Sequence, residues 1–177
     1  MAELIRLDTS YRASFLAAMA EFADEGRTGD DSMVGADLAG WTGRWDSPEG
    51  FAEYVRLTNA DAEHVRHEGW VLCTNLWWVE DGEYVGRIAV RHELNENLFE
   101  VGGHIGYDVR RSRRREGHAT AMLAAVLPVA AGLGIDRALV TCDESNAASR
   151  VVIERNGGVL EDVRQGKLRY WIDLSLR

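Results

Sequence analysis

Apolar positions along this chain change several times between an alternating and a helical spacing. Two runs rich in tryptophan, valine and isoleucine, Gly69–Val79 and Tyr84–Val90, are strand-like, and Asp81-Gly82 between them predicts a hairpin turn. After Gly117 the spacing becomes helical, because apolar residues return every three or four positions. The apolar face of this predicted helix comprises Ala119, Met122, Leu123, Val126, Leu127 and Ala130.

The same spacing rules give an order of elements for the rest of the chain. Residues 26–50 are rich in glycine and aspartate and predict a structured loop with room for a short helix. The strand, helix, strand order in the middle indicates a mixed α/β sheet with a central βαβ crossover. The other predicted elements are a strand at Leu4–Leu7, helices over residues 9–22 and 47–59, strands at Phe99–Val109 and Ala138–Cys142, a helix capped by Asn146, and a hairpin around Gly166.

Composition places the chain among globular proteins with a full hydrophobic core. Its 177 residues are 46% hydrophobic and 28% charged, which predicts a single domain over residues 1–177. No apolar run approaches the roughly 18 residues that a membrane helix needs, so no membrane partner is expected. Cys73 and Cys142 are too few for a disulfide framework, which favours the cytoplasm. The formal net charge of −9 argues against general nucleic-acid binding.

A cluster of basic residues contrasts with this acidic background. Five of the six residues from Arg110 to Arg115 are arginine, and a helix opens just after them at Gly117. Amide groups at a helix N-terminus lack intrahelical acceptors, and the helix dipole favours negative charge there. The segment therefore predicts a polyanion site. The alternatives are a solvated surface and a nucleic-acid-binding patch, and the Gly-x-x-x-x-Gly-Lys pattern of a nucleoside triphosphate loop is absent.

The spacing Arg114-x-x-Gly117-x-Ala119 resembles the acetyl-coenzyme A signature of the GNAT superfamily of N-acetyltransferases. Asn146, in a helix that ends in a glycine turn, and Gly86, within a strand, are similar to further features of that family. The block at residues 102–107 resembles a bacterial subgroup of predicted acetyltransferases. The resemblance implies a GNAT-like fold, in which a mixed and mostly antiparallel central sheet carries a βαβ acetyl-CoA-binding core and flanking helices.

The resemblance also implies where acetyl-CoA (the acyl donor) binds, in a site that needs no metal. Backbone amides over residues 115–120 are expected to hold the pyrophosphate, and one or more arginine side chains the 3′-phosphate. Asn146 either bonds the pantetheine arm or acts only as an N-cap, and His118 is either a surface residue or a ligand contact. The expected donor-binding residues are Tyr107, Val109, Arg114, Arg115, Glu116, Gly117, His118, Ala119, Thr120, Asn146 and Ser149.

Acyl transfer to an amine needs a base that removes a proton and a donor that stabilises the oxyanion. A backbone N–H near residues 107–109 is expected to polarise the thioester carbonyl. His104 is the first candidate for the base, because it lies on the predicted strand beside the expected thioester, and Glu100 is the second. His92 and Glu93, at the end of the preceding strand, are further candidates.

The thiolate leaving group is expected to take its proton from Ser149 or from water. Many members of the family take this proton from a tyrosine, but Ile153 occupies the matching position here. Unassisted departure is reasonable, since a thiol with a pKa of about 8.5 leaves readily at neutral pH.

The expected activity is transfer of an acetyl group from acetyl-CoA to a primary amine of a small molecule, by direct attack in a ternary complex. The alternatives are acetylation of a protein amine and a catalytically silent acyl-CoA-binding or regulatory module. A homodimer is compatible with all three. Trp41 and Trp45 are either core residues or a wall of the acceptor site, and Asp30 and Asp31 favour a cationic acceptor.

Overall fold

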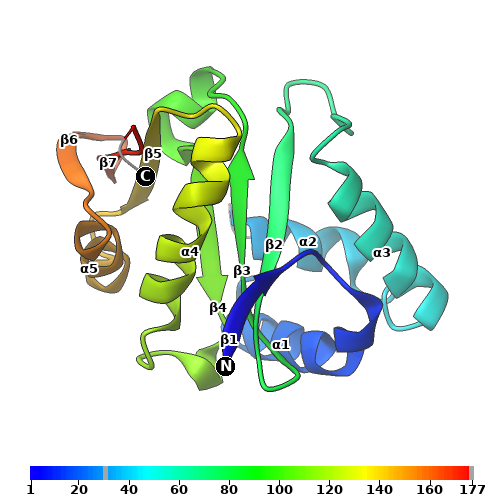
Figure 1. Ribbon diagram of the computed structural model, residues 1–177. Helices are drawn as coiled ribbons and strands as arrows, with labels where there is room; N and C mark the ends of the chain where they lie inside the picture. Colours follow the sequence, from blue (N-terminus) through cyan, green and yellow to red (C-terminus); the bar gives the residue numbers. More distant parts are fainter. Residues whose placement is uncertain (30–31, 176–177) are drawn as a thin grey trace.

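The computed structural model describes residues 1–29 and 32–175 and is built around one seven-stranded sheet (Figure 1). The strand order is β1-β2-β3-β4-β5-β7-β6, and β4 and β5 are the parallel pair among otherwise antiparallel neighbours. The mixed, mostly antiparallel sheet predicted from the sequence is confirmed. The strands are β1 (Ala2–Ile5), β2 (Cys73–Glu80), β3 (Glu83–Arg91), β4 (Ile105–Val109), β5 (Arg137–Asp143), β6 (Val159–Arg164) and β7 (Lys167–Asp173).

Among the described residues, five longer helices flank this sheet, and several begin at the residues that the sequence predicted. The Ser47 hydroxyl accepts a hydrogen bond from Gly50 N–H at 3.0 Å, and Asn146 Oδ1 accepts one from Ser149 N–H at 3.0 Å. The predicted cap at Asn146 and the predicted helix start at residues 47–48 are confirmed. The helices are α1 (Arg12–Asp24), α2 (Met33–Trp41), α3 (Pro48–Ala60), α4 (His118–Gly132) and α5 (Ala147–Arg155), with short turns η1 (Thr9–Tyr11), η2 (Leu98–Gly102) and η3 (Arg111–Arg113).

The two faces of the sheet carry separate hydrophobic cores. In Figure 1, α4 and α5 lie to one side and α1, α2 and α3 to the other. Helices α4 and α5 supply Met122, Leu127 and Ile153 to the first core, and α1 to α3 supply an aromatic core to the second. Trp41 and Trp45 are buried in this second core, which confirms the core alternative for both. Asp30 and Asp31 lie outside the described residues.

Strands β4 and β5 pair at a single register position, Ile105 with Val140, and separate beyond it. Strand β4 instead stays against β3, where Gly86 lies opposite Val109. A Cβ atom on Gly86 would lie 2.4 Å from the Asp108 carbonyl oxygen, so a glycine is required for this close approach. The end of β4 is therefore held on one side and open on the other.

The predicted strand at Phe99–Val109 is wrong in its first half. Residues 98–102 form the helical turn η2, in which Gly103 N–H donates to Leu98 O at 2.6 Å, and β4 begins only at residue 105. Gly103 has φ 68°, and a Cβ there would lie 2.7 Å from the Leu139 carbonyl oxygen. Glycine thus lets the chain turn sharply before the strand. As a result, Glu100 and His104 lie outside β4.

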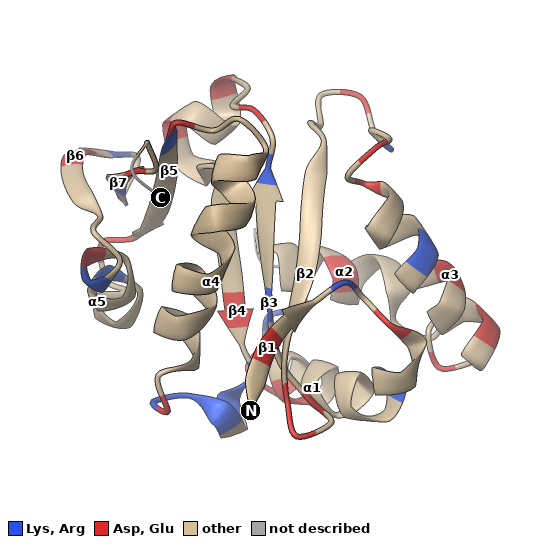
Figure 2. Cartoon of the chain, in the orientation of Figure 1, with Lys and Arg blue, Asp and Glu red and all other residues tan. Residues whose placement is uncertain are grey.

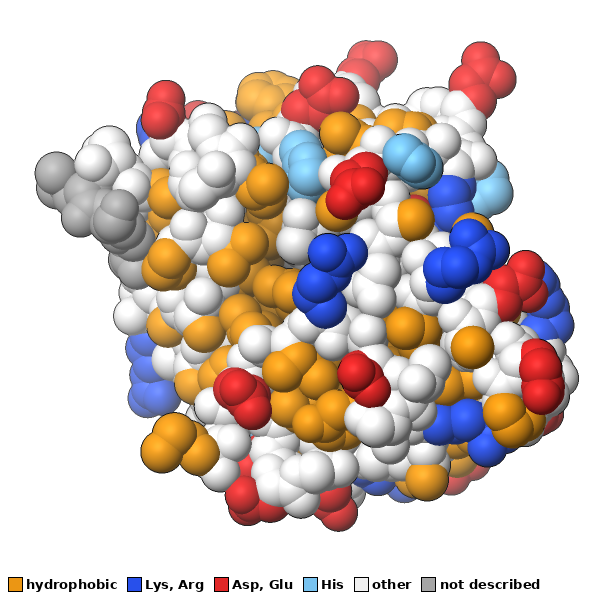
Figure 3. Space-filling model, turned by 45° about the vertical axis from the view of Figure 1, so that its right-hand side comes forward, with side chains coloured by type: hydrophobic (Ala, Val, Ile, Leu, Met, Phe, Trp, Pro, Cys, Tyr) orange, Lys and Arg blue, Asp and Glu red, His pale blue; other side chains and the backbone are white. Residues whose placement is uncertain are grey.

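Charged side chains are distributed unevenly over the molecule. Figure 2 shows a concentration of basic residues in the connection that precedes α4. On the face shown in Figure 3, acidic and basic side chains are interspersed with apolar ones, and histidines gather at its upper edge. Within the described residues, no helix combines the length and the apolar character needed to cross a membrane. The predicted polyanion site therefore coincides with this concentration of basic residues.

Candidate active site

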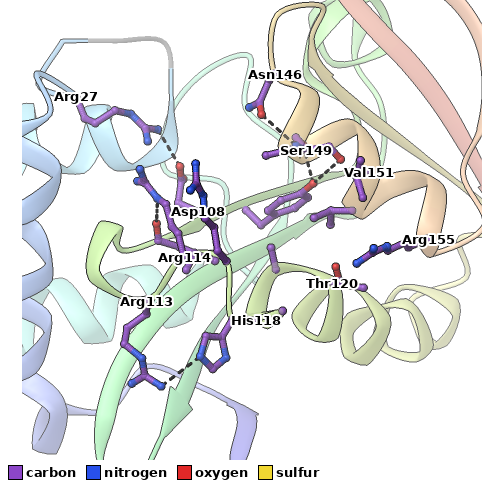
Figure 4. Close-up of a pocket in the computed structure, with 17 residues that line it drawn as sticks. Arg27, Asp108, Arg113, Arg114, His118, Thr120, Asn146, Ser149, Val151 and Arg155 are labelled. Carbon is purple, nitrogen blue, oxygen red and sulfur yellow. Dashed lines mark hydrogen bonds and ion pairs between the residues drawn. The ribbon is translucent and has the colours of Figure 1, made fainter.

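A cavity of about 580 Å³ opens where β4 and β5 separate, at the N-terminus of α4 (Figure 4). We call it the α4 cavity. It brings together every predicted donor-binding residue except Glu116. Glu116 does not line the cavity and forms an ion pair with Arg113 at 3.0 Å. The cavity is lined by Arg27, Tyr107, Asp108, Val109, Arg113, Arg114, Arg115, Gly117, His118, Ala119, Thr120, Asn146, Ala148, Ser149, Val151, Val152 and Arg155.

The start of α4 presents free amide groups to this cavity. Gly117 is the N-cap with φ 87° and ψ −3°, a left-handed conformation that favours glycine. The first helical bond runs from Ala121 N–H to Gly117 O at 3.1 Å. The N–H groups of His118, Ala119 and Thr120 consequently have no acceptor among the described residues. With the positive end of the helix dipole, they form an anion subsite of the predicted kind.

Most arginines of the basic turn are already paired with carboxylates. Arg110 bonds Glu21, and Arg114 forms a two-bond ion pair with Glu25 at 2.5 and 2.8 Å. Arg114 Nε also donates to the Val109 carbonyl oxygen at 2.9 Å. These side chains therefore fix the turn against α1 and the end of β4, and their charge is largely compensated.

The uncompensated positive charge of the α4 cavity comes from Arg115 and Arg155. Among the described residues neither makes a hydrogen bond or an ion pair, and both line the cavity. Arg155 lies at the end of α5 (Figure 4) and was not predicted from the sequence. The sequence feature that could have identified Arg155 is a helical spacing. Ala148, Val151 or Val152, and Arg155 lie on one face of α5, and all of them line this cavity. The two cations can approach a phosphate from different elements.

His118 is buried, so the alternative that it is a surface residue is wrong. It lines the α4 cavity, so a contact with the ligand stays a prediction. The Trp78 indole N–H donates to its Nδ1 at 3.2 Å, and its Nε2 lies 3.1 Å from a Glu116 oxygen. The tryptophan on β2 thereby holds the ring under the first turn of α4. Both ring nitrogens are engaged, which suits a positioning role for the turn.

Two hydroxyl groups meet inside the cavity, beside the opening between β4 and β5. The Tyr107 hydroxyl lies 2.6 Å from Ser149 Oγ, and Asn146 caps the same turn of α5 (Figure 4). Burial raises the pKa of Tyr107 well above its ordinary value, so the phenol stays protonated at neutral pH. Ile153, at the position where the resemblance implied an acid, is fully buried in the core. Proton donors near this opening are therefore Tyr107 and Ser149.

The predicted bases are not among the residues that line the α4 cavity. His104 is buried, and its Nδ1 accepts a hydrogen bond from Leu139 N–H at 2.9 Å. Burial, together with the nearby Arg91, lowers the pKa of His104 from 6.5 to about 4. Glu100 forms an ion pair with Arg164 at 2.6 Å. Both groups are occupied by partners within the fold.

The secondary candidates for the base lie elsewhere as well. His92 Nε2 is 2.8 Å from the Thr74 hydroxyl, and burial lowers the pKa of His92. Neither His92 nor Glu93 lines the α4 cavity. The free thiol of Cys142 is close to Ser149, and burial raises the pKa of Cys142. A protonated thiol is a poor nucleophile, which disfavours a covalent acyl-cysteine step.

A second cavity of about 480 Å³ lies between α2, the end of α3 and the face of β2 and β3. We call it the α2–α3 cavity. It approaches β4 at Gly106, where a Cβ atom would lie 3.1 Å from Met33 Cε and 3.5 Å from Arg91 Nη1, two side chains of this cavity. The neighbouring Tyr107 and Asp108 line the α4 cavity. The open end of β4 is therefore bordered by one cavity on each side.

This fold is that of an acyltransferase, and the α4 cavity fits the donor site that the sequence predicted. A family model for the acetyltransferase (GNAT) domain matches residues 20–159, and the chain belongs to this family. The protein is an acetyltransferase with acetyl-CoA as its donor. Among curated proteins, none matches the chain.

Solved structures of acetyltransferases share the fold. RimJ of Mycobacterium smegmatis, solved with a CoA-disulfide, is 19% identical with a TM-score of 0.68, over 97% of this chain and 81% of that chain. The ribosomal L7/L12 alpha-N-protein acetyltransferase RimL, solved with coenzyme A, is 19% identical with a TM-score of 0.66, over 99% and 96%. The microcin C7 self-immunity acetyltransferase MccE is 13% identical with a TM-score of 0.64, over 97% and 93%. At these identities the likeness concerns the fold.

Proposed function

We propose that this protein transfers an acetyl group from acetyl-CoA to the N-terminal α-amine of a polypeptide. The observation that carries the proposal is that the expected bases are engaged within the fold, His104 by Leu139 N–H and Glu100 by Arg164. An acceptor that is already neutral suits such a site. The similarity to RimL, described as an alpha-N-protein acetyltransferase, supports the same class of acceptor. A small-molecule amine, the acceptor expected from the sequence, is the alternative.

The pKa of the acceptor decides how much neutral amine is available. An α-amine has a pKa of about 7.7–8.0, so roughly 30–45% of it is neutral near pH 7.6. A lysine side chain has a pKa of about 10.4, and only about one molecule in 600 is neutral at that pH. Without a base, an α-amine therefore reacts far more readily than a lysine. This difference favours the N-terminus over internal lysines.

The α4 cavity fits the donor. Free N–H groups at the start of α4 face the position for the pyrophosphate, and Arg115 and Arg155 supply cations for the 3′-phosphate. Bound acetyl-CoA supplies a thioester, whose carbonyl reacts with the amine. The open end of β4 offers backbone N–H groups near Val109 that can polarise this carbonyl.

Tyr107 and Ser149 stabilise the developing thiolate by hydrogen bonding. Their hydroxyls lie 2.6 Å apart in the α4 cavity. Full proton transfer from either hydroxyl is uphill, because the pKa of a thiol is about 8.5 and that of a phenol about 10. The hydroxyl pair therefore donates hydrogen bonds to the thiolate. The attacking nitrogen loses its proton to solvent as the amide forms, and solvent protonates the departed thiolate. The amine attacks directly, since burial keeps the Cys142 thiol protonated.

Product analysis with matched peptides tests the proposal. One peptide has a free N-terminus and no lysine, and its partner has a blocked N-terminus and one lysine. A small primary amine completes the set. With wild-type protein and acetyl-CoA, thiol release and a mass increase of one acetyl group are expected with the first peptide. Acetylation of the lysine peptide or of the small amine at an equal or higher rate refutes an α-amine acceptor. No thiol release with any amine favours a silent acyl-CoA-binding module.

A further inference from the structure

The α2–α3 cavity contains a set of charged side chains that are mostly paired with one another. Asp37 binds the Arg87 guanidinium and accepts a hydrogen bond from the Tyr54 hydroxyl at 2.8 Å. Asp61 accepts a hydrogen bond from Arg66 Nη2 at 2.7 Å. Within each pair, the positive charge of the arginine and the negative charge of the aspartate compensate one another.

Asn75 connects the two pairs and fixes their geometry. Its side-chain oxygen accepts a hydrogen bond from Arg87 Nη2 at 3.1 Å, and its Nδ2 donates to Asp61 Oδ2 at 3.3 Å. Because Asn75 and Arg87 are buried on adjacent strands, the network forms a rigid wall. Its carboxylates are committed to internal partners and do not leave a free negative charge for a cationic ligand.

Arg91 is the cation of this cavity that has no carboxylate partner in residues 1–29 and 32–175. Its Nη1 donates to the carbonyl oxygens of Gly102 and Gly103, each at 3.1 Å. Its Nε and Nη2 make no hydrogen bond with the described residues. Burial and the positive charge of Arg87 lower the pKa of Arg91, so its surroundings leave the cation electrostatically uncompensated.

The remaining charged side chains of the α2–α3 cavity do not compensate the charge of Arg91. His64 and Glu68 are exposed, and solvent screens their charges. Arg91 is half-buried beside β4, and its guanidinium borders the space that a side chain at position 106 would fill. An anion bound there would gain charge-assisted hydrogen bonds from donors that are fixed in place by the two glycine carbonyls.

The distance to the reacting centre limits where such an anion can lie on the acceptor. The backbone groups that can polarise the thioester lie at residues 107–109, one to three positions beyond Gly106 on β4. At about 3.3 Å per strand residue, this span is roughly 3–10 Å. A group that Arg91 binds must therefore be only a few bonds from the acceptor amine.

We propose that Arg91 binds a carboxylate of the acceptor that lies close to the accepting amine, so that the enzyme selects acidic acceptors. This inference rests on the proposed function, because it assigns the α2–α3 cavity to the amine substrate. The carboxylate belongs either to an acidic side chain at the first or second position of a polypeptide or to the α-carboxylate of a free amino acid. Both present the same chemistry to a guanidinium.

Steady-state kinetics on matched acceptors test the inference. Peptides with Asp or Asn at the first position, and again at the second, differ only in the charge. Serine and serinamide form the corresponding pair for a free α-carboxylate, compared at equal concentrations of neutral amine because the α-carboxylate raises the pKa of the neighbouring amine. Wild-type kcat/KM is expected to be at least tenfold higher for the charged member of one of these pairs. The pair that shows the preference identifies the source of the carboxylate.

Variants of Arg91 test whether this residue causes the preference for charged acceptors. Arg91→Gln is expected to reduce it to less than twofold, Arg91→Lys to retain part of it, and both to bind CoA as the wild type does in calorimetry. Arg56→Gln, which removes an exposed arginine from α3, is the matched control and keeps the full preference. Thermal unfolding verifies that each variant is folded. If Arg91→Gln does not fold, Arg91→Lys and the wild-type ratios decide.

The outcomes separate this inference from the function on which it rests. Acetylation of the neutral and charged members at equal rates in every pair overturns the role of Arg91 and leaves the acetyltransferase proposal intact. A preference that persists in a folded Arg91→Gln variant also overturns it. An absence of acetylation with all peptides, while CoA still binds, refutes the proposed acceptor class itself, whatever the result with free amino acids.

Discussion

The anion subsite at the start of α4 makes a sharp prediction for two substitutions of Gly117. This residue has φ 87° and ψ −3°, so any side chain there introduces backbone strain of about 1–2 kcal/mol. No heavy atom lies within 4 Å of a Cβ built on Gly117, so neither substitution causes a steric clash at that atom. Gly117→Ala and Gly117→Asp therefore share the strain, and only the second adds a negative charge.

The charge difference sets the size of the effect on coenzyme A binding. Two unit charges about 4 Å apart repel by about 1 kcal/mol in water and by about 4 kcal/mol at the lower effective dielectric of a protein surface. The position for the pyrophosphate adjoins this residue, so Gly117→Asp is expected to bind at least tenfold more weakly than Gly117→Ala, about 1.4 kcal/mol. The two variants are expected to have similar unfolding temperatures.

Isothermal titration calorimetry with CoA measures the difference directly, because no turnover occurs. The gap between the two variants should narrow at high salt, since ions screen repulsion between partly exposed charges. If folded Gly117→Asp binds CoA within twofold of Gly117→Ala, the phosphates do not lie at this helix start. In that case the free amides of α4 have another role.

Three further predictions follow from the geometry of the site. Tyr107→Phe removes a hydroxyl that lies 2.6 Å from Ser149 Oγ. Because the lost hydrogen bond is worth about 1 kcal/mol, turnover at saturating acetyl-CoA is expected to fall about threefold to tenfold, with unchanged affinity for CoA. Normal turnover would exclude the hydroxyl pair from stabilising the thiolate. Arg155→Gln is expected to weaken CoA at least fivefold and dephospho-CoA less than twofold in calorimetry, and equal losses would place this arginine away from the 3′-phosphate. Because the pKa of His104 is lowered from 6.5 to about 4, its stabilising contribution is complete above pH 6.5 and is lost as the pH falls toward 4, with a limit of about 3 kcal/mol. Urea unfolding between pH 7.5 and 4.5 should show a flatter pH profile for His104→Gln, and parallel profiles would contradict this reasoning.

Local signals in the sequence were sufficient to predict the ends of several elements and the helix start at Gly117. Asp81 and Gly82 have φ 51° and 81°, as the predicted hairpin turn requires. The cap at Asn146 forms as predicted, Ser47 caps α3 at the predicted helix start, and Gly117 opens α4. These features depend on residues within about four positions of one another. Short-range sterics and hydrogen bonding are therefore enough to decide them.

Long-range contacts decided which predicted residues are free to act. Arg110 and Arg114 meet Glu21 and Glu25, each 89 positions away, so the run of arginines is mainly an anchor for the turn. His104 is occupied by Leu139, 35 positions along the chain. No spacing rule anticipates such partners, because they depend on which strands and helices pack together.

The sequence alone thus determined the order of elements, the mixed sheet and the helix start that faces a polyanion. Only the tertiary structure decided that Arg155 joins the α4 cavity from α5 and that Arg91 is left without a carboxylate in the α2–α3 cavity. The reason is physical: periodicity and capping act through neighbours along the chain. The charge of a cavity is the sum over side chains from several elements, and that sum exists only after they have packed.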